Sequence, residues 1–109
     1  MSELHYSVWG PSTDDPGSAP EVIGSFAAVG TVLVSLWSAD HRAGGRMHTD
    51  AQRFDSPAAA AAAALADARA YAESACRDAA TRFAAVPAEQ RAGLFRLRVA
   101  EPDRRPPAP

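Results

Sequence analysis

The chain contains one cysteine, Cys76, and no lysine or asparagine among its 109 residues. A single cysteine excludes an internal disulfide and the paired-cysteine spacing of a structural zinc site. All 11 Lys or Arg residues are arginine, isoleucine occurs once and alanine is abundant. Such residue usage indicates a GC-rich bacterial or phage gene rather than a mechanism. Cys76 falls on the apolar stripe of a predicted helix, so we expect a small buried side chain.

Long apolar segments are also missing. The longest run, Phe26 to Trp37, is too short to span a bilayer and is interrupted by glycine, threonine and serine. The first residues, Met1 to Leu4, lack the basic and apolar regions of a secretion signal. We therefore expect a cytoplasmic protein without membrane contact. A formal net charge of −2 gives no overall attraction to nucleic acid, which is disfavoured as a partner.

The chain lacks the motifs of common catalytic and nucleotide-binding sites. Gly24 and Gly30 stand six positions apart and no lysine accompanies them, which does not match a phosphate-binding loop. There is no nucleophile elbow and no recognisable catalytic triad. These absences argue against an enzyme, and we predict no cofactor.

The most clearly patterned segment is Ser56 to Val86, which predicts one long helix. Ser56 suits the N-cap and Pro57 the first helical position, while Pro87 disfavours helix at Val86. About 30 residues at about 1.5 Å each give about 45 Å, so we expect the alanine turns at 58–64 to overhang the sheet. The expected core-facing residues recur at intervals of three, four and seven. They are Leu65, Ala68, Ala72, Ala75, Cys76, Ala79, Phe83 and Val86.

Period-two alternation and β-branched residues predict strands at 4–9, 29–38, 46–54 and 94–99, with a short extended piece at 21–25. Residues 10–20 are rich in proline and glycine and predict a loop. The fold class is therefore α+β: a small antiparallel sheet of three to five strands with the alanine-rich helix across one face. We expect one domain over 1–100 and a disordered proline- and arginine-rich tail over 101–109.

Potential metal ligands gather around the predicted hairpin between the second and third long strands. His48 and Asp50 are two positions apart on a strand and share a face. The turn would bring Asp40 or His41 near them, and imidazole with carboxylate suits a divalent transition metal or acid–base chemistry. A solvated edge strand explains the same four residues and is the interpretation we favour.

A single helix covers only one face of a sheet. If that face holds Tyr6, Val34, Leu36 and Leu97, a second face remains with much apolar surface. Its members would be Trp9, Leu33, Trp37, Leu94, Arg96 and Arg98. Aromatic residues and arginine are enriched at protein interfaces, so we interpret this set as a protein-binding surface.

Three arrangements would account for such a face. A second copy or another protein could cover it, residues 11–29 could fold over it, or single-stranded nucleic acid could stack on Trp9 and Trp37 with its phosphates on Arg96 and Arg98. We expect the first. The sequence thus predicts a non-catalytic interaction module of a regulatory, inhibitory or accessory kind, acting as a homodimer. A nucleic-acid binder and a small enzyme at the hairpin are the alternatives.

Overall fold

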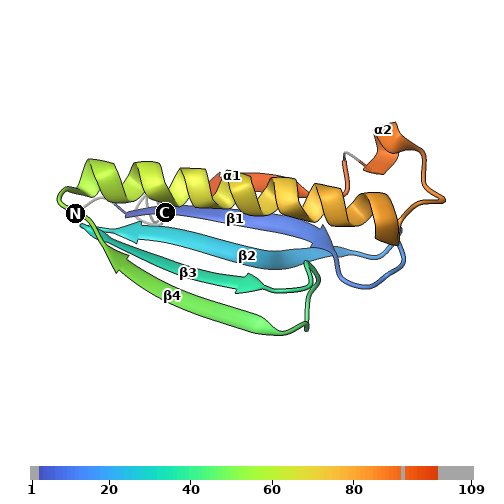
Figure 1. Cartoon of the computed structure of the whole chain (residues 1–109), viewed down its shortest axis with the longest axis horizontal. Helices are drawn as coiled ribbons and strands as arrows, with labels where there is room; N and C mark the ends of the chain where they lie inside the picture. Colours follow the sequence, from blue (N-terminus) through green and yellow to red (C-terminus); the bar gives the residue numbers. More distant parts are fainter. Residues whose placement is uncertain (1–2, 92, 101–109) are drawn as a thin grey trace, which may run out of the picture.

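A computed structural model describes residues 3–91 and 93–100, and they form one antiparallel sheet with a long helix laid across it (Figure 1). The predicted α+β fold is confirmed. The strands follow the order β4-β3-β2-β1-β5 across the sheet. The elements are β1 (Glu3–Pro11), β2 (Pro20–Val29), β3 (Val32–Ser38), β4 (Met47–Arg53), α1 (Pro57–Arg82), α2 (Ala88–Arg91) and β5 (Arg96–Ala100). The predicted tail at 101–109 lies outside the described residues.

The helix α1 begins where its sequence indicates and ends four residues early. The Ala59 N–H donates to Ser56 Oγ over 3.1 Å, and Pro57 occupies the first helical position. At the other end Phe83 leaves the helical conformation, with φ −117° and ψ 41°, and its side chain is buried. The predicted end at Val86 is wrong because the chain turns where it buries this aromatic ring.

Alanines form most of the buried stripe of α1. The buried residues are Ala60, Ala64, Ala68, Tyr71, Ala75 and Ala79. The predicted overhang at 58–64 is wrong, because Ala60 and Ala64 are fully buried against strands of nine and ten residues. Cys76 is exposed rather than buried, since it lies about 100° around the helix from Ala75. Tyr71, which the periodicity did not single out, is the largest side chain of the stripe.

The strand β2 is the main departure from the predicted topology. Residues 20–29 form a complete central strand that pairs with β1 and β3. Gly30, with φ 59°, and Thr31 then make a two-residue turn into β3. Because β2 lies within the sheet, residues 11–29 do not fold over it, and that alternative is wrong. Only residues 12–19 remain as a loop.

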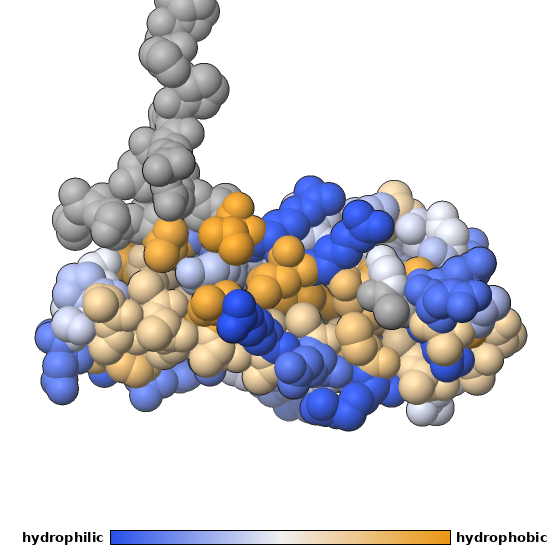
Figure 2. Space-filling view, turned by 90° about the horizontal axis from the view of Figure 1, so that it is seen from above, coloured by the Kyte–Doolittle hydropathy of each residue, from blue (hydrophilic) through white to orange (hydrophobic). Residues whose placement is uncertain are grey.

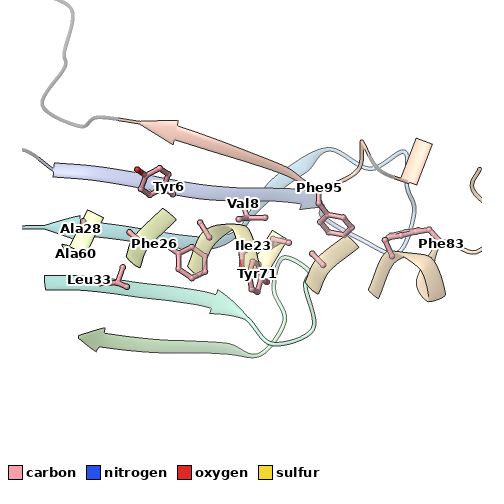
Figure 3. Close-up of a cluster of buried hydrophobic side chains, with 14 residues drawn as sticks. Tyr6, Val8, Ile23, Phe26, Ala28, Leu33, Ala60, Tyr71, Phe83 and Phe95 are labelled. Carbon is pink, nitrogen blue, oxygen red and sulfur yellow. The ribbon is translucent and has the colours of Figure 1, made fainter. Parts of the chain in front are cut away.

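Tyr71 lies near Ile23 among the buried side chains of the core (Figure 3). Its ring fills a notch that an irregularity in β2 creates. The pairing register shifts between Val8, opposite Gly24, and Trp9, opposite Val22, so Ile23 has no partner in the ladder. The absence of a side chain at Gly24 admits the Tyr71 ring. Its hydroxyl donates to the carbonyl oxygen of Ser38 at 2.7 Å and lies 3.1 Å from that of Ile23. One residue thereby links α1 to both central strands.

Filling this notch should destabilise the protein. In Gly24→Ala the new Cβ would lie 2.9 Å from Tyr71 Cε2 and 3.1 Å from Phe26 Cε2, so the ring must move. We expect a loss of about 1–3 kcal/mol in the free energy of unfolding, measured by urea denaturation. Gly93→Ala is the control, because its Cβ meets only the Gln90 carbonyl oxygen at 3.6 Å. Equal stability of the two variants would contradict the notch.

Tyr71 should also make stability depend on alkaline pH. Burial raises the pKa of its phenol above the ordinary value of 10.0. The folded state therefore favours the neutral form, and the free energy of unfolding should fall as the pH rises above about 10. Tyr71→Phe should lose about 1–2 kcal/mol near neutrality, because the buried Ser38 carbonyl loses its donor, and should lack the alkaline decline. Urea titrations at about pH 8 and about pH 10.5 measure both effects, with Tyr6→Phe as control. An unchanged decline in Tyr71→Phe would disprove this assignment.

Candidate functional site

One face of the sheet is not covered by α1, and we call it the open face. Cross-strand partners share a face, and the pairs Trp9–Val22, Ala27–Val34 and Trp9–Arg96 all lie on the side away from the helix. Its members include His5, Ser7, Trp9, Val22, Ala27, Val29, Val32, Val34, Leu36, Thr49, Ala51, Arg53, Arg96 and Arg98.

Aliphatic side chains occupy the centre of the open face. Val22, Val29, Val34 and Leu36 are between 41% and 46% exposed, and they stand on the central strands β2 and β3. Scattered exposed apolar residues are ordinary, but neighbours on paired strands form a continuous patch. The open face is therefore an extended apolar surface, but Val34 and Leu36 at its centre are residues that the sequence led us to expect under the helix.

Two of its six predicted members are on the other side of the sheet. Leu33 is only 2% exposed, and Trp37 is half-buried; both face α1. Val34 and Leu36, predicted to lie under the helix, are exposed instead. The strand β3 is apolar on both faces, so its periodicity does not reveal which face is buried. The turn at Gly30 and Thr31, which sets Leu33 opposite Ala28, decides it.

The other four predicted members meet in one pocket at the end of β1, which we call the Trp9 pocket. Trp9, Leu94, Arg96 and Arg98 line a hollow of about 350 Å³, closed on one side by the loop after β1. Pro16 and Ser18 of the loop contribute to this side, together with Pro11 at the end of β1 and Pro20 at the start of β2. This volume is within the range of small-ligand sites.

Contacts within the Trp9 pocket hold both guanidinium groups. Arg98 Cζ stands 4.5 Å above the centre of the Trp9 ring, a cation–π arrangement. Arg96 Nε donates to the Gly93 carbonyl oxygen over 3.4 Å. The indole N–H of Trp9 donates to Ser7 Oγ at 2.9 Å, so the ring itself is oriented. Neither arginine forms an ion pair with a carboxylate within the described part of the chain.

The charged side chains described on the open face are arginines. Arg53, Arg96 and Arg98 lie along its two edges, and His5 is the only other titratable group among the side chains described there. No carboxylate occurs among those side chains. The pairing also places Glu3 opposite Val29, at one end of this face. Any partner of the open face therefore meets an aliphatic centre with basic margins.

The four hairpin residues do not assemble into a metal site. His41 and His48 line a hollow of about 360 Å³ between α1 and β4, but Asp50 lines a neighbouring one and Asp40 lines neither. Among residues 3–91 and 93–100, no three potential ligands from histidine, cysteine, aspartate and glutamate come together. His48 instead stacks on Trp37, with ring centres 5.7 Å apart.

His41 and its neighbours tie the hairpin to the helix. His41 Nε2 lies 3.0 Å from Ser74 Oγ, and its Nδ1 lies 3.6 Å from Asp78 Oδ2. Arg82 holds Asp78 at 3.2 Å and reaches Asp14 in the loop after β1 at 3.1 Å. The His41–Ser74 and Arg82–Asp14 contacts join residues 33 and 68 positions apart, so no local motif could have predicted them. Asp78 and Arg82 are four positions apart on α1, a spacing that does predict an ion pair.

Asp40 belongs to the hairpin turn itself. The Ser38 hydroxyl donates to Asp40 Oδ1 at 2.7 Å and lowers the pKa of this carboxyl group, and Arg42 contributes in the same direction. Gly45 leaves room for the carboxylate, because a Cβ there would overlap Asp40 Oδ1. The position of Asp40 is thus explained by the geometry of the turn.

No described helix is long and apolar enough to cross a membrane. Comparison of the chain with protein-family models, with curated proteins and with solved structures finds no match.

Proposed function

We propose that this protein is a non-catalytic interaction module that buries the open face of its sheet against another protein chain. The observation that carries the proposal is the patch of half-exposed aliphatic side chains across β2 and β3. Burying apolar surface contributes about 25 cal/mol per Å², so a protein surface of matching shape would gain from covering it.

The dimensions of the face suit such an interface. Five strands about 4.8 Å apart, each contributing about seven residues at about 3.3 Å, span roughly 24 by 23 Å. The projected area is about 550 Å², and side-chain relief adds to it, which approaches the roughly 800 Å² per partner of a standard interface. An aliphatic centre with arginines at the margins also follows the usual division into core and rim.

A second copy of the chain is the first occupant to test, as the sequence predicts. Two sheets can stack face to face about 10 Å apart, and their inward side chains then interdigitate. Because the arginines lie along β4 and β5, the two copies can bury their valines while the guanidinium groups remain hydrated. A regulatory, inhibitory or accessory protein would carry out its role through this surface.

The alternatives receive less support. Trp37 lies on the helix side, so the two tryptophans cannot form one stacking platform for nucleic acid. Arg98 already covers a face of the Trp9 ring, and the aliphatic centre offers no further aromatic surface for bases. An enzyme at the hairpin would need His41, His48 and the carboxylates to converge. Asp40 and His41 line one hollow, but His48 and Asp50 are not part of it.

A charge placed in the patch should separate the copies. In Val34→Arg a guanidinium replaces a central, 46% exposed valine, so we expect the dimer dissociation constant to rise at least about 30-fold. Size-exclusion chromatography with light scattering over a concentration series measures it. Ala62→Arg, on the exposed side of α1, is the matched control and should remain dimeric.

Circular dichroism must show that both variants are folded. A Val34→Arg dimer as tight as wild type would refute the open face as the self-interface. A wild-type chain that stays monomeric at every concentration would exclude the second copy and leave a different protein as the partner.

A further inference from the structure

The strand β5 is an outer edge of the sheet, and its two sides differ in chemistry. It pairs with β1 alone among the described strands. Figure 2 looks down on the molecule from above the view of Figure 1 and shows strongly hydrophobic side chains exposed directly beside strongly hydrophilic ones. Edge strands are ordinarily protected from further pairing by charges, bulges or covering segments.

Alternation along β5 separates the two kinds of side chain. Arg96 and Arg98 pair with residues of the open face, whereas Leu97 and Val99 lie opposite Val8 and Tyr6 on the helix side. Val99 is 61% exposed, the most exposed large hydrophobic residue of the described chain. The edge thus presents a basic row on one face and an aliphatic row on the other.

Contacts within the chain orient the two arginines of the basic row, which could bind anions. Stacking on Trp9 fixes the Arg98 guanidinium, and the Gly93 carbonyl oxygen fixes Arg96. Residues two apart on a strand are separated by about 6.6 Å, which is also the spacing of alternate carboxylates in another extended chain. Because an arginine guanidinium and a carboxylate form paired, charge-assisted hydrogen bonds, two such contacts would define both register and direction.

We propose that the β5 edge binds an extended acidic segment of another protein as a sixth strand of the sheet. Alternate aspartate or glutamate residues of that segment face Arg96 and Arg98, and its intervening aliphatic residues pack beside Leu97 and Val99. Backbone hydrogen bonds supply affinity and the alternating side chains supply specificity. The inference deepens the proposed function, since it names the chemistry of a partner at one edge of the same sheet.

A second copy does not fit this edge. Two β5 strands could pair antiparallel about Leu97 or about Arg98. The first pairing sets Arg96 opposite Arg98 of the other copy, and the second sets Arg98 opposite Arg98. Like charges directly opposite each other are destabilising. The occupant is therefore a chain of complementary charge rather than β5 of another copy.

The test uses the full chain and a fluorescein-labelled, glycine-flanked peptide of alternating glutamate and valine, followed by fluorescence anisotropy. Arg96→Glu combined with Arg98→Glu should weaken binding at least about 30-fold and should instead bind the alternating lysine and valine peptide. Arg69→Glu with Arg77→Glu changes the net charge equally on the exposed side of α1 and should bind like wild type. Two further glutamate peptides carry N-methyl groups on alternate backbone amides, one on the odd and one on the even positions. Only the peptide whose methyl groups point toward β5 should lose binding.

Several results would overturn the inference. They are absence of binding at millimolar peptide, equal binding of the lysine peptide by wild type, equal loss in the Arg69 and Arg77 control, or full binding by both N-methylated peptides. Binding of a labelled oligodeoxythymidine in place of the acidic peptide would assign the arginines to nucleic acid instead. A wild-type chain that stays monomeric at every concentration and still binds the glutamate peptide would remove the second copy and keep the edge, so failure at the edge and failure of the open face are distinguished.

Discussion

The contact between Tyr71 and the irregularity in β2 determines how the two layers of this protein meet. The buried stripe of α1 is nearly all alanine, so the shape of these side chains does not fix where the helix lies along the sheet. Tyr71 fixes the position instead. Its ring fits where Gly24 lacks a side chain, and its hydroxyl donates to the Ser38 carbonyl oxygen and lies near that of Ile23. Placing Tyr71 there also places Ser74 beside His41 of the hairpin and Arg82 beside Asp14 of the loop after β1. These contacts fix the positions of the hairpin and the loop.

Covering one face of the sheet so closely leaves the other face with its own apolar centre. The strand β3 is aliphatic on both sides, and its outward residues have no covering layer in the described chain. The charges divide accordingly: arginines border the open face, while Asp14, Asp40 and Asp78 are engaged around the hairpin. One side of the sheet is thus covered by α1, whereas the apolar residues of the other side are exposed in the described chain.

The sequence predicted the fold class correctly, but it did not show which face of β3 is buried. Serine and proline marked the start of α1, and alternation in β1 placed Trp9 on the open face, because both signals are local. Leu33 and Trp37 were misplaced because an apolar residue at nearly every position carries no period-two signal. The length of β2 was missed since Gly24, read as an interruption, in fact accommodates a ring from 47 positions away, a relation that only the folded chain contains.

The alanine surface of α1 has a consequence for how this protein can change in evolution. Where a helix contacts a sheet through methyl groups, its backbone lies close to the strands, and almost any larger residue at Ala60, Ala64, Ala68, Ala75 or Ala79 would push the whole element outward. These five positions are therefore expected to drift little, although none contributes a large side chain. Variation is expected to accumulate in β4, whose residues are all exposed, so this edge of the sheet can diversify without disturbing the core.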